Sequence, residues 1–343
     1  MSLPGDCCRS ALAPSRLFGF SCLAWPSYRR GADQAALYLG PEPSISPLRY
    51  CLTQRLGVYL LEWLPASRVT GDNGIGEYAS VISECVATVS SSIRGAKPFM
   101  IGHSLGGTLA AIASALAPDS IQALVLLGTP LCFEPGKSRF RDTLVSLVRP
   151  TLSEGPPVPG SLLSQVSVLA SPTTFIWSRL ADAAVSATDR YAMDIHARVE
   201  RWALDEAPLP GKLVHEMVEW LYRENRLCRG VLEVCNMRVG PFSLSVPTLA
   251  VVNTADEVAP LASIKPFIEA MPTSDVRIIQ FPGRRASVCS TLESWSDAKR
   301  MLNSGRKSLS GSIPISETPP KGAEPEGSRE RRPPAIAACA NAL

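Results

Sequence analysis

A serine between two glycines carries the clearest chemical signal in this chain. The pentapeptide 102–106 reads Gly-His-Ser-Leu-Gly and follows the apolar segment 97–101, which predicts a buried strand. The segment 107–113 is rich in small and aliphatic residues and predicts a helix. A sharp turn from a strand into a helix would expose the hydroxyl of Ser104 as a nucleophile. The alternative interpretation is an ordinary glycine-rich turn between a strand and a helix.

A serine hydroxyl is a weak nucleophile until a base takes its proton and an acid orients that base. Leu105 would start the helix, so its backbone N–H could donate to a developing oxyanion. Asp256 fits the acid because it comes just after the apolar segment 246–253. The alternative for Asp256 is a capping residue at the start of the next helix. Glu257 is adjacent, but its side chain would point in another direction.

The base is missing from its expected place. A catalytic histidine should follow the last predicted strand, 276–281, yet the chain has three histidines and none comes after His215. His103 lies inside the pentapeptide, where a side chain packs beside the nucleophile instead of activating it. His196 and His215 fall in segments of helical pattern, and we interpret them as surface or packing residues, with a catalytic role as the alternative.

The elements around these residues predict a mostly parallel sheet with helices on both faces, because apolar strands alternate with helical segments. In the clearest helical segment, 73–92, the apolar residues recur at helical spacing. The long stretch 131–245 comes after the strand that ends near Gly128 and predicts a helical cap over the carboxyl ends of the strands. The expected strands cover residues 57–63, 97–101, 123–128, 246–253 and 276–281.

The two ends lack a sustained pattern and are rich in Pro, Arg, Gly and Ser, which is typical of disorder. The sequence therefore predicts five parts. They are a poorly patterned N-terminal segment (1–47), the first part of an α/β core (48–130), the helical cap (131–245), the second part of the core (246–282) and a disordered or off-frame tail (283–343).

A change of reading frame is the second interpretation of both ends. Codons allowed for residues 289–310, read from their third base, permit a peptide that begins Leu-His-Ala-Gly-Ile-Leu-Val-Gly. This peptide has a histidine after the last predicted strand. Codons allowed for residues 32–43, read from their second base, permit Leu-Ile-Lys-Arg-Pro-Tyr-Ile-Leu-Asp-Leu-Ser-Pro. The nucleotide sequence of the gene decides between disorder and a frame change.

Composition excludes several classes of protein. The net charge of +3 gives no special attraction to nucleic acid or to a membrane surface, and no apolar run approaches the length of a membrane span. The 10 cysteines include no C-x-x-C pair, so we expect free thiols and no metal site. Pro14 and Arg16 interrupt the only apolar stretch near the N-terminus, so we expect no signal peptide and a cytoplasmic location. Neither a metal nor an organic cofactor is implied, and the oligomeric state stays open.

Several segments, taken in order, resemble the polyhydroxyalkanoate synthases, a branch of the α/β-hydrolase superfamily. The resemblance covers roughly residues 48–282 and implies the α/β-hydrolase fold, with an ester or an acyl-CoA type of substrate. The segments that carry it are Val58–Trp63, Gly102–Leu109, Leu209–Gly211, Trp220–Leu227, Val246–Thr248 and Asp256–Pro260.

The chain departs from the synthases at three places. They use a cysteine nucleophile where this chain has Ser104, their acid is commonly followed by His where this chain has Glu257, and their final histidine is absent here. A serine ester is harder to pass on than a thioester and suits hydrolysis. We therefore expect a serine-nucleophile ester hydrolase or acyltransferase, weakened by the missing base. The alternatives are a true polyhydroxyalkanoate synthase that uses acyl-CoA, and a non-catalytic descendant that keeps the fold for binding.

Overall fold

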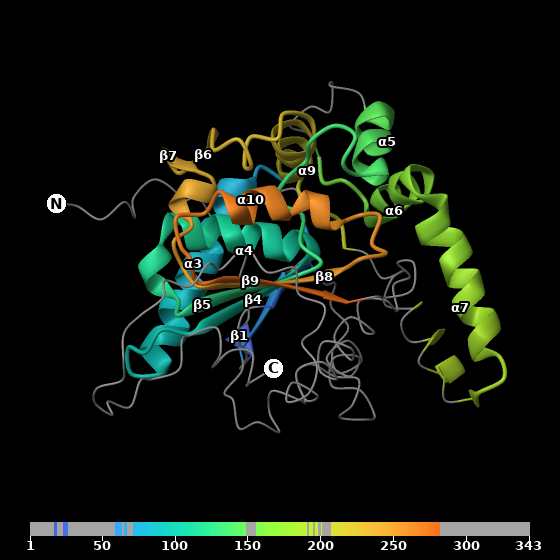
Figure 1. Cartoon of the computed structure of the whole chain (residues 1–343), viewed down its shortest axis with the longest axis horizontal. Helices are drawn as coiled ribbons and strands as arrows, with labels where there is room; N and C mark the ends of the chain where they lie inside the picture. The colour runs from blue at the N-terminus through green and yellow to red at the C-terminus, as the bar shows by residue number, and fades with distance from the viewer. Residues whose placement is uncertain are drawn as a thin grey trace, which may run out of the picture.

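The computed structural model describes residues 17–18, 23–26, 59–63, 65–66, 71–148, 156–190, 192–194, 196–197, 200 and 207–281. Its centre is a seven-stranded sheet in the order β1-β3-β2-β4-β5-β8-β9 (Figure 1). The β1–β3 pair is antiparallel and the other neighbouring pairs are parallel, so the predicted mostly parallel sheet is confirmed. The strands are β1 (Leu17–Phe18), β2 (Leu23–Pro26), β3 (Leu60–Trp63), β4 (Phe99–His103), β5 (Ala123–Leu127), β8 (Thr248–Asn253) and β9 (Val276–Phe281).

Backbone pairing aligns the ends of the central strands. His103 of β4 pairs with Leu127 of β5, and Leu127 pairs with Val251 of β8. Asn253 at the end of β8 pairs with Phe281 at the end of β9. Because these strands are parallel, the segments that follow them leave from one edge of the sheet, which is where α/β proteins bind ligands.

Three helices pack on one face of this sheet: α3 (Ile75–Ser92), α4 (Ser104–Leu116) and α10 (Lys265–Glu269); α3 and α4 also pack against each other (Figure 1). Apolar residues of β4, β5 and β8, such as Met100, Leu124 and Val252, join their buried side chains in one hydrophobic core. On the opposite face of the strands Val125 and Leu249 are buried as well. Burial on both faces explains why β5 and β8 are continuous apolar runs.

The predicted helical segment at 73–92 forms α3, which begins at Ile75. The apolar positions that show helical spacing in the sequence are all buried in the structure. They are Tyr78, Val81, Ile82, Cys85, Val86 and Val89. The periodicity therefore identified the face of α3 that contacts the sheet.

The stretch between β5 and β8 has two different parts. The first contains α5 (Arg139–Leu147), α6 (Gly160–Ala170), the π-helical turn η2 (Thr173–Trp177) and α7 (Ser178–Ser186), which we call the cap helices; Figure 1 shows α7 reaching away from the sheet. The second contains α9 (Gly211–Glu216), the π-helical turn η3 (Met217–Arg223) and a hairpin of β6 (Leu232–Val234) and β7 (Met237–Val239). Its residues Leu213, Leu221, Leu232 and Val239 belong to the main hydrophobic core. The limits of the predicted cap at 131 and 245 stay a prediction.

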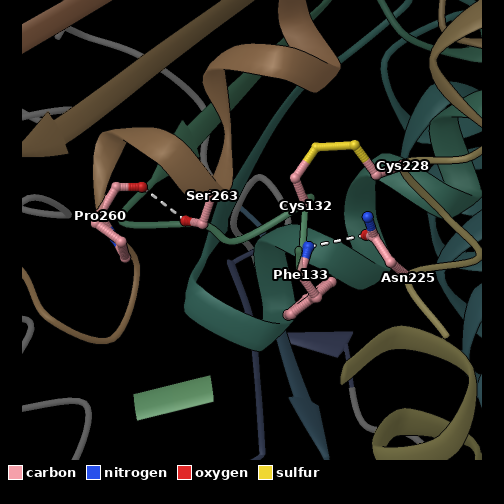
Figure 2. The surroundings of a disulfide bond; sticks show 6 residues. All are labelled: Cys132, Phe133, Asn225, Cys228, Pro260 and Ser263. Atoms are coloured by element: carbon pink, nitrogen blue, oxygen red, sulfur yellow. Dashed lines mark hydrogen bonds between the residues drawn. A yellow bond between two sulfur atoms is a disulfide. The ribbon is translucent and has the colours of Figure 1, made fainter. Parts of the chain in front are cut away.

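The prediction of free thiols is wrong for one pair of cysteines. Cys132, which follows β5, and Cys228, which follows η3, form a disulfide with a Cα–Cα distance of 5.0 Å (Figure 2). Beside it the backbone N–H of Phe133 donates to Oδ1 of Asn225 at 2.8 Å. The disulfide therefore ties the segment after β5 to the loop that leaves η3. Among the described residues Cys85 keeps a buried free thiol.

The two ends of the chain fall largely outside the described residues. The N-terminal part contributes the short strands β1 and β2, and the predicted tail 283–343 is not described. In the described ranges no helix is both long enough and apolar enough to cross a membrane. The same part of the chain contains no group of three or more His, Cys, Asp or Glu side chains that could hold a metal ion.

Candidate active site

Ser104 lies where β4 turns into α4, and its backbone has a positive φ of 49°. Side-chain-bearing residues seldom adopt this conformation, which costs about 1–3 kcal/mol and persists only where the surroundings enforce it. The G-x-S-x-G pattern thus forms the sharp turn between a strand and a helix that the sequence predicts. The predicted strand at 97–101 lies two residues later, at Phe99–His103.

Close packing of glycines enforces the turn at Ser104. A Cβ atom added to Gly102 would lie 2.5 Å from Cα of Gly107, and one added to Gly107 would lie 2.8 Å from Cγ2 of Thr129. Such distances are too short for any real Cβ, so the backbones of β4 and α4 meet directly at these glycines, and the side chain of Thr129, which follows β5, packs against Gly107. Oγ1 of Thr108 also donates to the carbonyl oxygen of Pro130 at 2.8 Å, which ties α4 to the end of β5.

Leu105 occupies the first turn of α4. Backbone N–H groups in the first turn of a helix have no partner within the helix, and the helix dipole makes this end positive. The N–H of Leu105 is therefore a candidate donor to an oxyanion that forms on a carbonyl attacked by Ser104. A second donor would come from the loop after β2 in this topology, and residues 27–58 lie outside the described residues.

Asp256 lies in the turn that follows β8. Its Oδ1 accepts hydrogen bonds from the N–H groups of Val258 at 2.8 Å and Ala259 at 3.0 Å, so Asp256 stabilises its own turn. Burial raises the pKa of its carboxyl group; the two backbone N–H donors act against this shift, and the charge of Glu257 adds to it. The position of a Cβ at Gly128 would be 3.8 Å from Oδ2 of Asp256. The second carboxylate oxygen thus lies at the end of β5, the strand next to the one that carries Ser104.

Glu257 contacts the cap helices. Its Oε2 accepts hydrogen bonds from Oγ of Ser171 at 3.1 Å and from Oγ1 of Thr174 at 3.3 Å. Its carbonyl oxygen accepts a hydrogen bond from Oγ of Ser138 at 3.0 Å. These hydroxyl residues were missed in the sequence analysis. The only signal is at Ser138, a residue type that commonly caps a helix and directly precedes α5.

The histidines lie in three separate elements. His103 ends β4, and burial lowers its pKa to about 4, so its imidazole is neutral at physiological pH. His215 lies in α9 and His196 in the helical residues 196–197. Neither of these two belongs to the turns that leave the carboxyl ends of β4, β5 and β8.

Comparison with known proteins agrees with this geometry. Residues 63–154 match the model of the alpha/beta hydrolase fold family. A solved monoacylglycerol lipase from Paleococcus ferrophilus superposes with a TM-score of 0.51 at 18% identity, over 84% of this chain and 97% of the lipase. The chain has the α/β-hydrolase fold. Hydrolases of this fold carry their nucleophile on a sharp turn from a strand into a helix.

Among curated proteins, this α/β-hydrolase chain is similar to poly(3-hydroxyalkanoate) polymerase subunits named PhaC. It is 23% identical to the subunit of Haloferax mediterranei, over 70% of this chain and 49% of that protein. It is 24% identical to the subunit of Synechocystis, over 61% of this chain and 58% of that protein. The chain thus spans about half the length of the relatives it matches. The resemblance to polyhydroxyalkanoate synthases is confirmed at this level.

Proposed function

We propose that Ser104, Leu105 and Asp256 form the remaining part of an acyl-transfer site, in an ester hydrolase or acyltransferase related to the polyhydroxyalkanoate synthases. The observation that carries the proposal is the positive φ of Ser104 at the end of β4, with Oδ2 of Asp256, from the turn after β8, beside Gly128 at the end of the neighbouring strand β5. The similarity to poly(3-hydroxyalkanoate) polymerase subunits supports a substrate with an ester or acyl-CoA type of carbonyl group.

The proposed reaction has two steps. Oγ of Ser104 attacks the carbonyl carbon, and the N–H of Leu105 donates a hydrogen bond to the oxyanion that forms. The bond to the alcohol or thiol then breaks, and this leaving group departs with a proton, so that the acyl group is joined to Ser104 as an ester. A water molecule or an acceptor hydroxyl then attacks this ester, which releases the acid or a new ester and restores the serine.

No histidine in this sequence stands at the expected place of the base. The backbone pairing of Phe281 with Asn253 places the end of β9 next to the start of the turn that contains Asp256. A histidine soon after Phe281 would therefore be able to reach Asp256 and Ser104. The peptide permitted by the second reading frame of residues 289–310 has such a histidine, at a position outside the described residues. We propose that a change of frame removed the base, and sequencing the gene tests this directly.

Labelling with a fluorophosphonate probe tests the role of Ser104. Without a base we expect slow labelling at Ser104 that is absent from the Ser104→Ala variant, because the remaining groups alone supply about 10³–10⁴-fold over water. A protein with the second frame restored should label faster by about 10³-fold or more. Rapid labelling of the chain as it stands would contradict a missing base, and labelling elsewhere would contradict a nucleophilic Ser104.

Two alternatives remain, each with an observation in its favour. The similarity to polymerase subunits favours a true synthase, which would consume acyl-CoA, release CoA and form insoluble product. The absence of any histidine after His215 favours a non-catalytic binding protein, for which neither labelling nor hydrolysis of p-nitrophenyl esters would exceed that of Ser104→Ala. A cytoplasmic location and the lack of a cofactor stay predictions.

A further inference from the structure

Glu257 lies between two parts of the molecule that the sequence separates by more than 80 residues. Its carboxylate accepts hydrogen bonds from Ser171 and Thr174 of the cap helices, while its backbone belongs to the turn of Asp256. Ser171 is 6% exposed and Thr174 is 7% exposed. Buried hydroxyl groups need hydrogen-bond partners, so separation of Glu257 from these two residues would carry a cost unless water replaced it.

The proton count of this cluster requires an acceptor at residue 257. Oγ of Ser171 lies 2.8 Å from Oγ1 of Thr174, and both lie within hydrogen-bond distance of Oε2 of Glu257. The two hydroxyl groups have one proton each, and a carboxylate accepts without donating. Thr174 donates to Glu257, and Ser171 donates to Thr174 or to Glu257. A side chain without an acceptor at residue 257 would leave the proton of Thr174 without this partner.

The contacts of Glu257 involve residues at the ends of the cap helices. Ser171 is the C-cap residue that follows α6, and Thr174 lies in η2, the π-helical turn between α6 and α7. Ser138 caps the start of α5, where its Oγ accepts a hydrogen bond from the N–H of Arg141 at 3.2 Å, and it donates to the carbonyl oxygen of Glu257. One residue therefore contacts the beginning of α5 and the junction of α6 with α7.

The turn around Glu257 is held as one unit. The N–H of Asp256 donates to the carbonyl oxygen of Asn253 at 3.1 Å, and its Oδ1 accepts from Val258 and Ala259 on the far side of Glu257. A displacement of Glu257 must therefore move the backbone of Asp256 or break these hydrogen bonds.

We propose that Glu257 is a positioning residue that couples the cap helices to the turn of Asp256. The placement of the candidate acid then depends on the contact between the cap helices and this turn. The coupling of the cap helices to this turn does not depend on what Ser104 does. Its effect on a reaction at Ser104 rests on the proposed function. Glu257→Leu removes the acceptor, and Glu257→Gln keeps one carbonyl oxygen for Thr174 and Ser171.

Amide hydrogen exchange on the full chain tests the coupling. In Glu257→Leu we expect exchange to rise by tenfold or more in two separate places, the amides of residues 171 and 173–177 and those of Val258 and Ala259. Glu257→Gln should restore most of the protection. The double variant Ser171→Ala, Thr174→Val should raise exchange at Val258 and Ala259 in the same way, although neither change lies in that turn. Glu269→Leu on α10, whose side chain is 51% exposed, is the matched control.

Two outcomes would overturn the coupling: faster exchange confined to residues 171–177, or a uniform rise that Glu269→Leu reproduces. The consequence for Ser104 is measured with a short and a long-chain fluorophosphonate. Glu257→Leu should change the ratio of their labelling rates by fivefold or more, whereas a general loss of stability would slow both equally. An unchanged ratio would overturn the link to the site. If no variant labels at Ser104, the proposed function fails, and the exchange result still decides the coupling.

Discussion

Ser104 follows β4 and Asp256 follows β8 at the same edge of one sheet, but the backbones of the two residues are held in different ways. The turn at Ser104 is set by close packing, since Gly102 and Gly107 leave no room for a side chain. The turn at Asp256 is set by hydrogen bonds to Val258 and Ala259 and by the contacts of Glu257 with the cap helices. The candidate nucleophile is thus placed by the core alone, while the candidate acid depends on a second part of the molecule.

The largest effect is expected from Gly102→Ala. Its Cβ would lie 2.5 Å from Cα of Gly107, a backbone atom that cannot move without displacing α4. We expect a loss of about 3 kcal/mol or more in the free energy of unfolding, measured by urea denaturation. Gly76→Ala in α3 is the matched control, because its Cβ would lie 3.8 Å from Cγ1 of Val234; it should gain up to about 1 kcal/mol. Equal stability of the two variants would mean that close packing does not fix the turn at Ser104.

A smaller effect is expected from Ser104→Gly. Glycine adopts a φ of 49° without the steric penalty of a side chain, so we expect the free energy of unfolding to rise by about 1 kcal/mol. Ser104→Ala keeps the penalty and should differ from the wild type by less than about 0.5 kcal/mol. If Ser104→Gly is less stable than Ser104→Ala, the backbone strain ascribed to the positive φ of Ser104 is absent.

The smallest effect is expected from Asp256→Asn, and it depends on pH. Burial raises the pKa of Asp256 in the folded state, so this state keeps a proton at pH values where the unfolded chain has lost it. The contribution of Asp256 to stability is therefore greatest below the unfolded pKa and declines as pH rises through the folded pKa. Asparagine can accept the same two N–H groups and does not titrate.

We therefore expect the stability of Asp256→Asn relative to the wild type to increase as pH rises across that window. Chemical denaturation of both proteins at a series of pH values measures it. A difference that stays constant with pH would show that burial does not affect the ionisation of Asp256.

The sequence predicted those parts of the fold whose packing is local and periodic. Strand β9 forms at residues 276–281 as predicted, and the helical spacing in α3 identified its buried face. Strands β1 and β2 were missed because two to four residues are too few for a pattern to emerge. Of the site, the sharp turn at Ser104 was predicted from its pentapeptide, whereas the close contact of Gly102 is with Gly107, one residue beyond that pentapeptide.

Contacts between distant segments could not be predicted in the same way. Cys132 and Cys228 are separated by 96 residues, and only the fold brings them together. Glu257 was expected to point away from the place of the acid, but nothing in its neighbours along the chain indicated Ser171 and Thr174 as partners. A hydrogen bond between single side chains of distant segments produces no periodic pattern in a sequence.

The disulfide also changes how the chain would respond to a protease. Cys132 and Cys228 enclose the cap helices in a covalent ring. A single cut of the backbone inside this ring leaves both fragments joined through sulfur, and they separate only in the presence of a reductant. Excision of the cap from an oxidised molecule therefore takes two cuts, and the disulfide keeps the core in one piece after both.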